Sequence, residues 1–339
     1  LIINTKFPIK LIGDKSLSKR DFKRISDPLT KFGARFKLKN KKNLPLTIFG
    51  SSQLKPIKYV ETRGSAQCKS AVIFGGMRTQ GTTIIKAKKS RNHTEIMSKH
   101  LNLPLICKKR KDYDEIKIKK IKNFKTLNYN IPSDISSSAF FIVLTLLSKN
   151  SKIVIRNVNV NKTRIGIIQI LNKMNAAIKI KNKKIYKGEE IGDIIVKSRD
   201  NLKSINCPKY FNSSAIDEFL LIFLVSAKSK GISHFKGISE LRHKESDRLK
   251  IASDILRMIG VKVEEKKDSL KIFGNPNLEL NKKFKISNFR KDHRVFMLSC
   301  IAALTLGGKW KIENSEAIKT SFPNFLLTLK KLGAKFKYD

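Results

Sequence analysis

The sequence contains few of the residues that build metal sites or disulfide frameworks. Its 339 residues include 4 cysteines and 5 histidines. The cysteines are far apart and form no CxxC pair, and the histidines lack the spacing of metal ligands. Because three of the cysteines lie in or beside apolar runs, we expect buried thiols in a reducing compartment. The sequence therefore predicts neither a metal centre nor a disulfide scaffold.

Signatures of several large protein classes are also missing. A nearly uninterrupted apolar stretch, residues 139–147, contains a single polar residue, Thr145. It is about half the length that a membrane span needs, and no signal peptide is visible. Neither a Gly-rich Walker or dinucleotide loop nor a GxSxG nucleophile elbow is present. We therefore expect a cytoplasmic protein with no membrane partner, and we do not expect it to bind nucleotides.

Acidic residues are scarce, since 27 Asp and Glu stand against 72 Lys and Arg, for a formal net charge of +45. Such an excess is typical of proteins that bind nucleic acid or anionic membranes. Here, however, lysines are spread over the whole chain, Ile and Asn are abundant beside them, and no aromatic–basic recognition motif accompanies them. This pattern favours an adenine-rich coding bias. We expect no nucleic-acid partner, and a basic nucleic-acid-binding protein is the most distant alternative.

What the chain does contain is a repeat. A strand, a polar loop, an amphipathic helix, usually a glycine, and a returning strand recur along it. The starting strands lie near residues 8, 82, 152, 232 and 310, and a spacing of ~75 residues suits a small α/β unit. Glycine after a helix suits the left-handed C-cap position. The helix ends and returning strands read LTKFGARFKL, MSKHLNLPLI, LNKMNAAIKI, LRMIGVKVEE and LKKLGAKFKY.

A second set of helices is apolar on nearly all sides, and such helices must be buried. The length of the chain suggests two domains, and Pro132 within LNYNIPSD suits a crossing between them. We therefore expect an α/β fold with domains at residues 1–131 and 132–339. The predicted buried helices contain AVIFGG (71–76), AFFIVLTLL (139–147), EFLLIFLVSA (218–227) and VFMLSCIAAL (295–304).

A polar or ionic segment precedes each predicted buried helix. Ser and Asp cap helices well, but Gln67, the Asp217-Glu218 pair and the Asp292-His293-Arg294 run exceed what capping requires. If the buried helices run parallel, their positive N-terminal ends meet in one region, which suits an anionic ligand. The four segments are GSAQCKS (64–70), PSDISSS (132–138), NSSAIDE (212–218) and KDHR (291–294).

The most charged stretch is SELRHKESDRLK (239–250). Ser246 or Asp247 could cap a helix that begins near Leu249. Lys244 and Arg248 are four residues apart, so a helical turn would put both on one side. Glu245 would then point elsewhere, toward a substrate proton. The alternative is an exposed helix entry with local ion pairs, because charge runs are usually solvated.

Charged residues elsewhere in the chain favour the interpretation of this stretch as part of a binding site. Asp217 and Arg294 stand at equivalent points of neighbouring repeats. A lysine and several arginines in one cleft suit phosphate and carboxylate groups. Carboxylates among those cations could move protons.

These segments resemble the motifs of the 5-enolpyruvylshikimate-3-phosphate synthase family. ELRHKESDRL (240–249) resembles the LRxKESDR signature, GSAQCKSA (64–71) the SAQxKSA segment, and KSRNHTEIM (89–97) the TRDHTExM stretch. Three further matches follow in the family's order, so that six ordered matches span the chain. They are SAIDEF (214–219), KDHR (291–294) and TSFPNF (320–325).

The resemblance implies a two-domain inside-out α/β barrel, the enolpyruvyl transferase fold, made of six β-α-β-α-β-β units. Five units are countable, so we expect the first unit to be largely missing before Leu1, and the chain given to be inactive alone. GDKSLSKR (13–20) matches the later family segment whose arginine contacts phosphoenolpyruvate. Arg20 takes that role, whereas Lys15 and Ser16 receive none.

The implied activity is transfer of the enolpyruvyl group of phosphoenolpyruvate to the 5-hydroxyl of shikimate 3-phosphate by a monomer, without metal or organic cofactor. Asp217 would be the base for the hydroxyl proton and Glu245 the acid toward the methylene carbon. Ser65, Ala66 (through its backbone), Gln67, Arg91 and Lys244 would bind shikimate 3-phosphate, and Arg20, Arg248 and Arg294 would bind phosphoenolpyruvate. His293, Lys319 and Thr320 receive no role.

The nearest alternative is UDP-N-acetylglucosamine enolpyruvyl transferase, which shares the fold and the phosphoenolpyruvate chemistry. That enzyme is expected to show a cysteine loop and different residues at KESDR, and this sequence shows neither.

Overall fold

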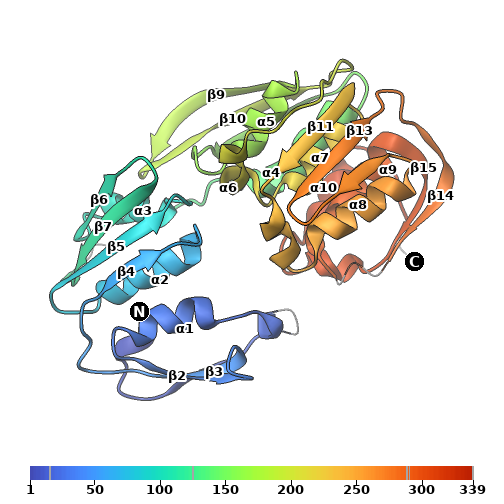
Figure 1. Ribbon diagram of the computed structural model, residues 1–339. Coiled ribbons are helices and arrows are strands. Elements are labelled where there is room, and N and C mark those ends of the chain that lie inside the picture. The colour runs from blue at the N-terminus through green and yellow to red at the C-terminus, as the bar shows by residue number, and fades with distance from the viewer. Residues whose placement is uncertain (15–16, 124–125, 288, 290, 338–339) are drawn as a thin grey trace. The chain divides into compact units, whose positions relative to one another are not determined.

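The computed structural model of this protein describes residues 1–14, 17–123, 126–287, 289 and 291–337. Over this range the chain forms two compact units (Figure 1). Unit 1 comprises Leu1–Asn130 together with Ile185–Glu189, and unit 2 comprises Ile131–Lys184 and Glu190–Asp339. Lys15 and Ser16, which received no role above, lie outside the described residues.

Unit 1 has two helices, α1 and α2, between an antiparallel sheet β1-β3-β2 and a mixed sheet β4-β5-β7-β6 (Figure 1). Phe32, Ile73 and Ile85 are fully buried in this unit. Its elements are η1 (Ile2–Asn4), β1 (Ile9–Leu11), η2 (Leu17–Lys19), α1 (Lys23–Thr30), β2 (Arg35–Lys39), β3 (Asn43–Phe49), β4 (Lys58–Glu61), α2 (Ala66–Gly76), β5 (Thr82–Lys88), α3 (His93–His100), β6 (Leu105–Lys109) and β7 (Tyr113–Lys119).

The remaining elements begin with α4. They are α4 (Ile135–Leu147), β8 (Lys152–Asn159), α5 (Gly166–Lys173), β9 (Ala177–Tyr186), β10 (Glu189–Lys197), η3 (Lys209–Phe211), α6 (Asn212–Ala215), α7 (Phe219–Ala227), β11 (Gly231–Lys236), η4 (Ser239–His243), α8 (Arg248–Met258), β12 (Val263–Glu265), β13 (Ser269–Gly274), β14 (Leu280–Ile286), α9 (His293–Leu306), β15 (Gly307–Ile312), η5 (Ser315–Ile318) and α10 (Phe325–Lys331).

Unit 2 is built around buried helices. Helices α4, α7 and α9 pack against one another, and each also packs on a strand of a different sheet, β8, β13 and β15 respectively. Every residue of α7 is buried, as expected for a helix without a polar face. The four apolar helices predicted from the sequence are confirmed as α2, α4, α7 and α9 of the described chain.

The repeat is confirmed in the strand order. In the described sheets β1-β3-β2, β5-β7-β6, β8-β10-β9 and β11-β13-β12, the first strand of each repeat pairs with the third, and the third with the second. A leading segment joins the first strand in parallel, as β4 does on β5 and β14 on β15. Shorter parallel bridges, Ser133 to Val158 and Asn206 to His234, mark the same place in the other repeats. The unit is therefore β-α-β-α-β-β.

The glycine prediction is confirmed in a broader form. Gly33, Gly260 and Gly333 have positive φ values after their helices, and Asn102 and Asn175 take the same left-handed conformation where no glycine is present. Asn tolerates this region better than most residues. The prediction of a returning strand after Gly333 is wrong, because residues 334–337 form no strand.

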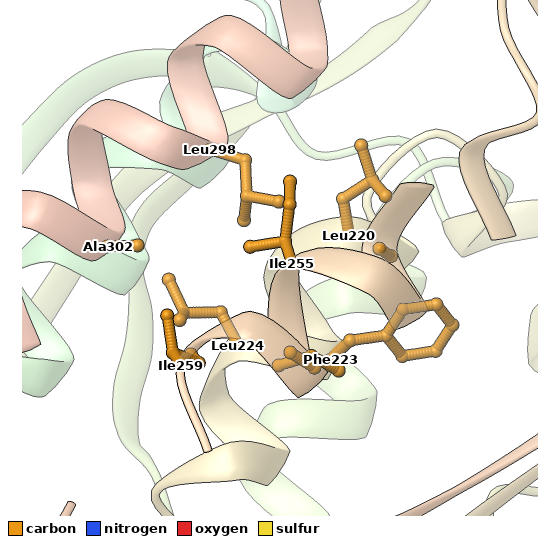
Figure 2. Close-up of a pocket in the computed structure, with 9 residues that line it drawn as sticks. Leu220, Phe223, Leu224, Ile255, Ile259, Leu298 and Ala302 are labelled. Carbon is orange, nitrogen blue, oxygen red and sulfur yellow. The ribbon is translucent and has the colours of Figure 1, made fainter. Parts of the chain in front are cut away.

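A pocket between the buried helices of unit 2 is lined by apolar side chains from α7, α8 and α9 (Figure 2). Leu220 and Leu224, Ile255 and Leu298 are among them. A charged substrate has no polar partner there, so we interpret this space as core packing. Among the described residues no single helix is long and apolar enough to cross a membrane, although η3–α6 and α7 pass that test together as a pair bent by 118°.

Candidate active site

In unit 1, the SAQ segment opens helix α2 from an ordered loop. The buried Glu61 carboxylate accepts hydrogen bonds from the backbone N–H groups of Arg63, at 3.0 Å, and Gly64, at 2.8 Å. Gly64 has a φ of +71°, which favours glycine at this turn. Ser65 is the N-cap, and its hydroxyl accepts from the Cys68 N–H at 3.3 Å.

A buried lysine joins this segment to the KSRNHTE segment. The Lys69 side chain is completely buried, and its ammonium group donates to the Arg91 carbonyl at 2.8 Å and pairs with Glu95 at 2.6 Å. The Ser70 and Thr94 hydroxyls are 2.6 Å apart. The structure thus brings the candidate phosphate ligand Arg91 beside the start of α2, where Ser65, Ala66 and Gln67 lie.

Arg20 lies in a different part of unit 1. It follows η2 and is exposed, and its carbonyl accepts from the Asn43 side chain at 3.1 Å. Asn43 begins β3, so this arginine belongs to the β1-β3-β2 sheet rather than to the start of α2.

In unit 2, three helix starts meet. Ser136, in the first turn of α4, donates its hydroxyl hydrogen to the Glu218 carboxylate at the start of α7. Arg294, in the first turn of α9, donates to the Asp217 carbonyl at 3.0 Å and lies 3.8 Å from a Glu218 oxygen. The predicted meeting of positive helix ends is confirmed for these three helices.

The KESDR stretch brings its cations to Asp217. The Lys244 ammonium lies 3.5 Å from one oxygen of the Asp217 carboxylate, and an Arg248 nitrogen lies 3.7 Å from the same oxygen. However, the expectation that one helical turn brings Lys244 and Arg248 together is wrong. Lys244 is extended and precedes the helix, whereas Arg248 is the first residue of α8. Asp247 is the N-cap, accepting from the Lys250 N–H at 2.9 Å.

Asp292 anchors Arg248 from the other side. It caps α9 by accepting from the Arg294 N–H at 3.0 Å, and its second oxygen accepts from Ser246 and from Arg248 Nε, both at 2.9 Å. Burial acts to raise the pKa of Asp292, but the charge and hydrogen bonds of Arg248 and the Ser246 hydroxyl outweigh it. The pKa therefore lies below the ordinary value.

Glu245 is paired with His293, whose Nδ1 lies 2.9 Å from the carboxylate. Burial acts to raise the pKa of Glu245, but the hydrogen bond and charge of His293 outweigh it and leave the pKa below the ordinary value. The expectation that Glu245 points away from the side shared by Lys244 and Arg248 is wrong, because the same carboxylate lies 3.8 Å from Arg248. His293, left without a role by the sequence, contacts the candidate acid.

Glu245, Asp292 and His293 place potential ligand atoms within 4.8 Å of one another. However, the Asp292 carboxylate already receives three side-chain hydrogen bonds from Arg248 and Ser246. A metal ion would also face the Arg248 guanidinium, a like charge. The cluster therefore fits an ion-pair network better than a metal centre.

The sequence did not predict the hydrogen bonds that connect Arg164 through Ser136 to Glu218, the acid beside Arg294. Arg164 precedes α5 and donates to the Ser136 hydroxyl at 2.8 Å and to Asp134, the N-cap of α4, at 3.1 Å. Ser136 in turn reaches Glu218. The available signal was the charge at position 218, directly before a wholly apolar helix. Nothing in the sequence around Arg164 marked it as a partner.

Repeated units with buried helices inside and sheets outside define the enolpyruvyl transferase fold. An enolpyruvyl transferase, NikO from Streptomyces tendae, has this fold with a TM-score of 0.74 over 100% of this chain and 76% of that chain, at 12% identity. A structure of EPSP synthase from Acinetobacter baumannii matches with a TM-score of 0.84 at 34% identity, over 97% of this chain and 74% of that chain.

The sequence comparisons narrow this class to one family. Residues 2–329 match the profile of EPSP synthase (3-phosphoshikimate 1-carboxyvinyltransferase). A 3-phosphoshikimate 1-carboxyvinyltransferase of Caldicellulosiruptor saccharolyticus is 38% identical over 96% of this chain and 74% of the relative. The 3-phosphoshikimate 1-carboxyvinyltransferase of Ruthia magnifica is 38% identical over 97% of this chain and 74% of the relative. This chain belongs to the EPSP synthase family, which confirms the first of the alternatives drawn from its sequence.

Proposed function

We propose that this protein transfers the enolpyruvyl group of phosphoenolpyruvate to the 5-hydroxyl of shikimate 3-phosphate and releases phosphate. Family membership supports this reaction. The structural observation that carries the proposal is that Asp217 in unit 2 is approached by Lys244 and Arg248, and that Arg294 donates to its backbone carbonyl. Such a group of fixed cations suits two substrates that carry several negative charges.

Proposed substrate contacts are assigned to each unit by itself. In unit 1, Ser65, Ala66, Gln67 and Arg91 are proposed to hold shikimate 3-phosphate, because a helix start with free N–H groups and an arginine suits its anionic groups. In unit 2, the family motif around Lys244 is the support for its proposed role as a ligand of shikimate 3-phosphate. In unit 2, Arg248 and Arg294 are proposed to bind phosphoenolpyruvate, whereas the same role for Arg20 of unit 1 rests on its family motif alone.

The addition step of the reaction needs two proton transfers in opposite directions. A proton adds to the methylene carbon of phosphoenolpyruvate while the 5-hydroxyl oxygen attacks the neighbouring carbon and gives up its hydrogen. The tetrahedral intermediate then loses phosphate, a proton leaves the new methyl group, and the double bond forms again. Asp217 is proposed to take the hydroxyl proton, and Glu245 to deliver the proton to carbon.

Glu245 must carry a proton to act as an acid, although its pKa lies below the ordinary value. Anionic substrates bring negative charge close to the carboxylate, and a nearby like charge raises the pKa of an acid. His293, at 2.9 Å, is placed to return a proton to it. Substrate binding is therefore expected to favour the protonated form of Glu245.

The test is phosphate release by the purified protein. Release should require both phosphoenolpyruvate and shikimate 3-phosphate, and mass spectrometry should find the enolpyruvyl adduct of the second. Release with UDP-N-acetylglucosamine in place of shikimate 3-phosphate, or release without any acceptor, would contradict the proposal.

A further inference from the structure

Glu218 is a fully buried acid that the reaction above does not use. Its side chain is 1% exposed. One carboxyl oxygen accepts from the Ser136 hydroxyl, and the other has no hydrogen-bond partner among the described residues. A buried carboxylate charge is strongly unfavourable unless it is fully paired, and one oxygen of Glu218 has no donor in the described part of the chain, so this environment favours the neutral acid.

The charged groups around Glu218 come from each element packed against it. Arg294 of α9 lies 3.8 Å from it, and Asp217 is its neighbour in the chain. Arg164, before α5, reaches it through Ser136 and also pairs with Asp134 at the start of α4. Burial raises the pKa of Glu218, with Asp217 acting in the same direction and Arg294 and Arg164 against it.

The geometry of Arg294 makes this acid relevant to binding. The guanidinium is held from one side by the Asp217 carbonyl at 3.0 Å, and its side chain keeps 15% exposure. A charged Glu218 at 3.8 Å would neutralise part of the positive charge of Arg294, whereas a neutral one would leave that charge for a ligand.

We propose that Glu218 is a positioning residue that controls how strongly Arg294 attracts the anionic phosphoenolpyruvate, with binding tightest while the Glu218 carboxyl is neutral. The inference rests on the proposed function, since it takes Arg294 as a ligand of that substrate. Glu218 touches Arg294 and Ser136 and acts on the substrate only through Arg294.

The sign of the effect follows from this geometry. Below its raised pKa, Glu218 is neutral and Arg294 carries its full charge. As the pH rises through that pKa, Glu218 ionises, and the KM for phosphoenolpyruvate should rise. Phosphoenolpyruvate and the other site residues also titrate, so the effect must be measured against a variant that cannot ionise at position 218.

The experiment measures the KM for phosphoenolpyruvate and kcat between about pH 5 and about pH 9 for the wild type and for Glu218→Gln. The wild-type KM should rise about tenfold more than that of Glu218→Gln across this range, with kcat altered less than about twofold in the variant. Glu240→Gln, which removes an exposed carboxylate nearby in sequence, should follow the wild type.

The outcomes separate the two proposals. If the wild type releases no phosphate from the two substrates, the proposed function fails. If it is active but Glu218→Gln shows the same pH dependence of KM, the role of Glu218 is overturned while the function stands. A loss of thermal stability alone, with parallel KM profiles, also overturns it.

A second variant covers the case in which Glu218→Gln does not fold. Ser136→Ala removes the hydroxyl that donates to Glu218, and losing a donor to the charged form raises an acid's pKa. The rise in KM should therefore move to higher pH in Ser136→Ala. An unmoved or lowered transition would contradict the proposal.

Discussion

Arg248 is the residue on which the acids of unit 2 depend. Its side chain is 3% exposed and lies within ion-pair distance of Asp217, Glu245 and Asp292. A buried charge must be paired and hydrogen-bonded to be tolerated. One guanidinium therefore fixes the relative positions of the proposed base, the proposed acid and the cap of α9.

Replacing Arg248 with lysine tests this dependence, because lysine keeps the charge but loses the planar fork. We expect Arg248→Lys to lower kcat/KM for phosphoenolpyruvate by about a hundredfold, a typical loss for a precisely aimed charged donor. Steady-state kinetics give the value. Arg257→Lys on the exposed side of the same helix is the matched control. Equal losses of kcat/KM in the two variants would contradict the role of Arg248.

Asp292 should make stability depend on pH. Its pKa is depressed in the folded protein, so its contribution is present above the ordinary value of 3.8 and is lost as the pH falls through the lower folded value. Asp292→Asn should lose about 3 kcal/mol at neutral pH, since Arg248 is left without its buried partner. The deficit, measured by urea unfolding against Asp254→Asn, should shrink below about pH 4. A deficit that is constant with pH would contradict this.

Residue types and their order along the chain were enough to predict Asp217, Lys244, Arg248 and Arg294 as a group. The sequence could not predict how they meet, because Lys244 reaches Asp217 from an extended segment rather than from a helical turn. The roles of Glu218 and Arg164 could not be predicted either, because their partners are distant in the chain.

At the scale of elements, the start of a helix is where the candidate ligands gather. Helices α2, α4, α8 and α9 begin with side-chain caps from Ser65, Asp134, Asp247 and Asp292. Capping residues give a local signal, so these starts could be predicted to within a few residues. The link between α2 and the first turn of α3 could not, because it is made by the buried Lys69–Glu95 pair.

Lys69→Met should cost about 3–5 kcal/mol of the free energy of unfolding, because Glu95 would remain buried and charged without its partner. Lys99→Met, an exposed lysine of α3, should cost little. The double variant Lys69→Met/Glu95→Gln should recover part of the loss in urea unfolding. A single variant as stable as the wild type would show that this buried pair does not stabilise unit 1.

At the scale of the molecule, the repeat carries most of the fold. Its period was readable because each unit places an all-apolar helix and a half-exposed helix at fixed spacing. The segment 334–337 was misread since its alternating sequence resembles the other returning strands, yet the described chain provides it with no strand partner. A strand exists only when a neighbour accepts its hydrogen bonds.

The net charge of +45 should give weak binding to polyanions that falls steeply with salt. Because the lysines are scattered, Lys244→Met should leave heparin or DNA binding unchanged in fluorescence titrations while it abolishes turnover. The exposed Lys250→Met should change neither. A selective loss of polyanion binding in Lys244→Met would instead favour an anion-binding role unrelated to catalysis.

The most direct measurement is phosphate release from phosphoenolpyruvate and shikimate 3-phosphate by Asp217→Asn beside Asp254→Asn, an identical change on the surface of α8. If Asp217 takes the hydroxyl proton, kcat should fall by about 10²–10⁴ in the first variant and hold its wild-type value in the second. Equal rates in both variants would contradict the assignment of catalysis to this group of residues.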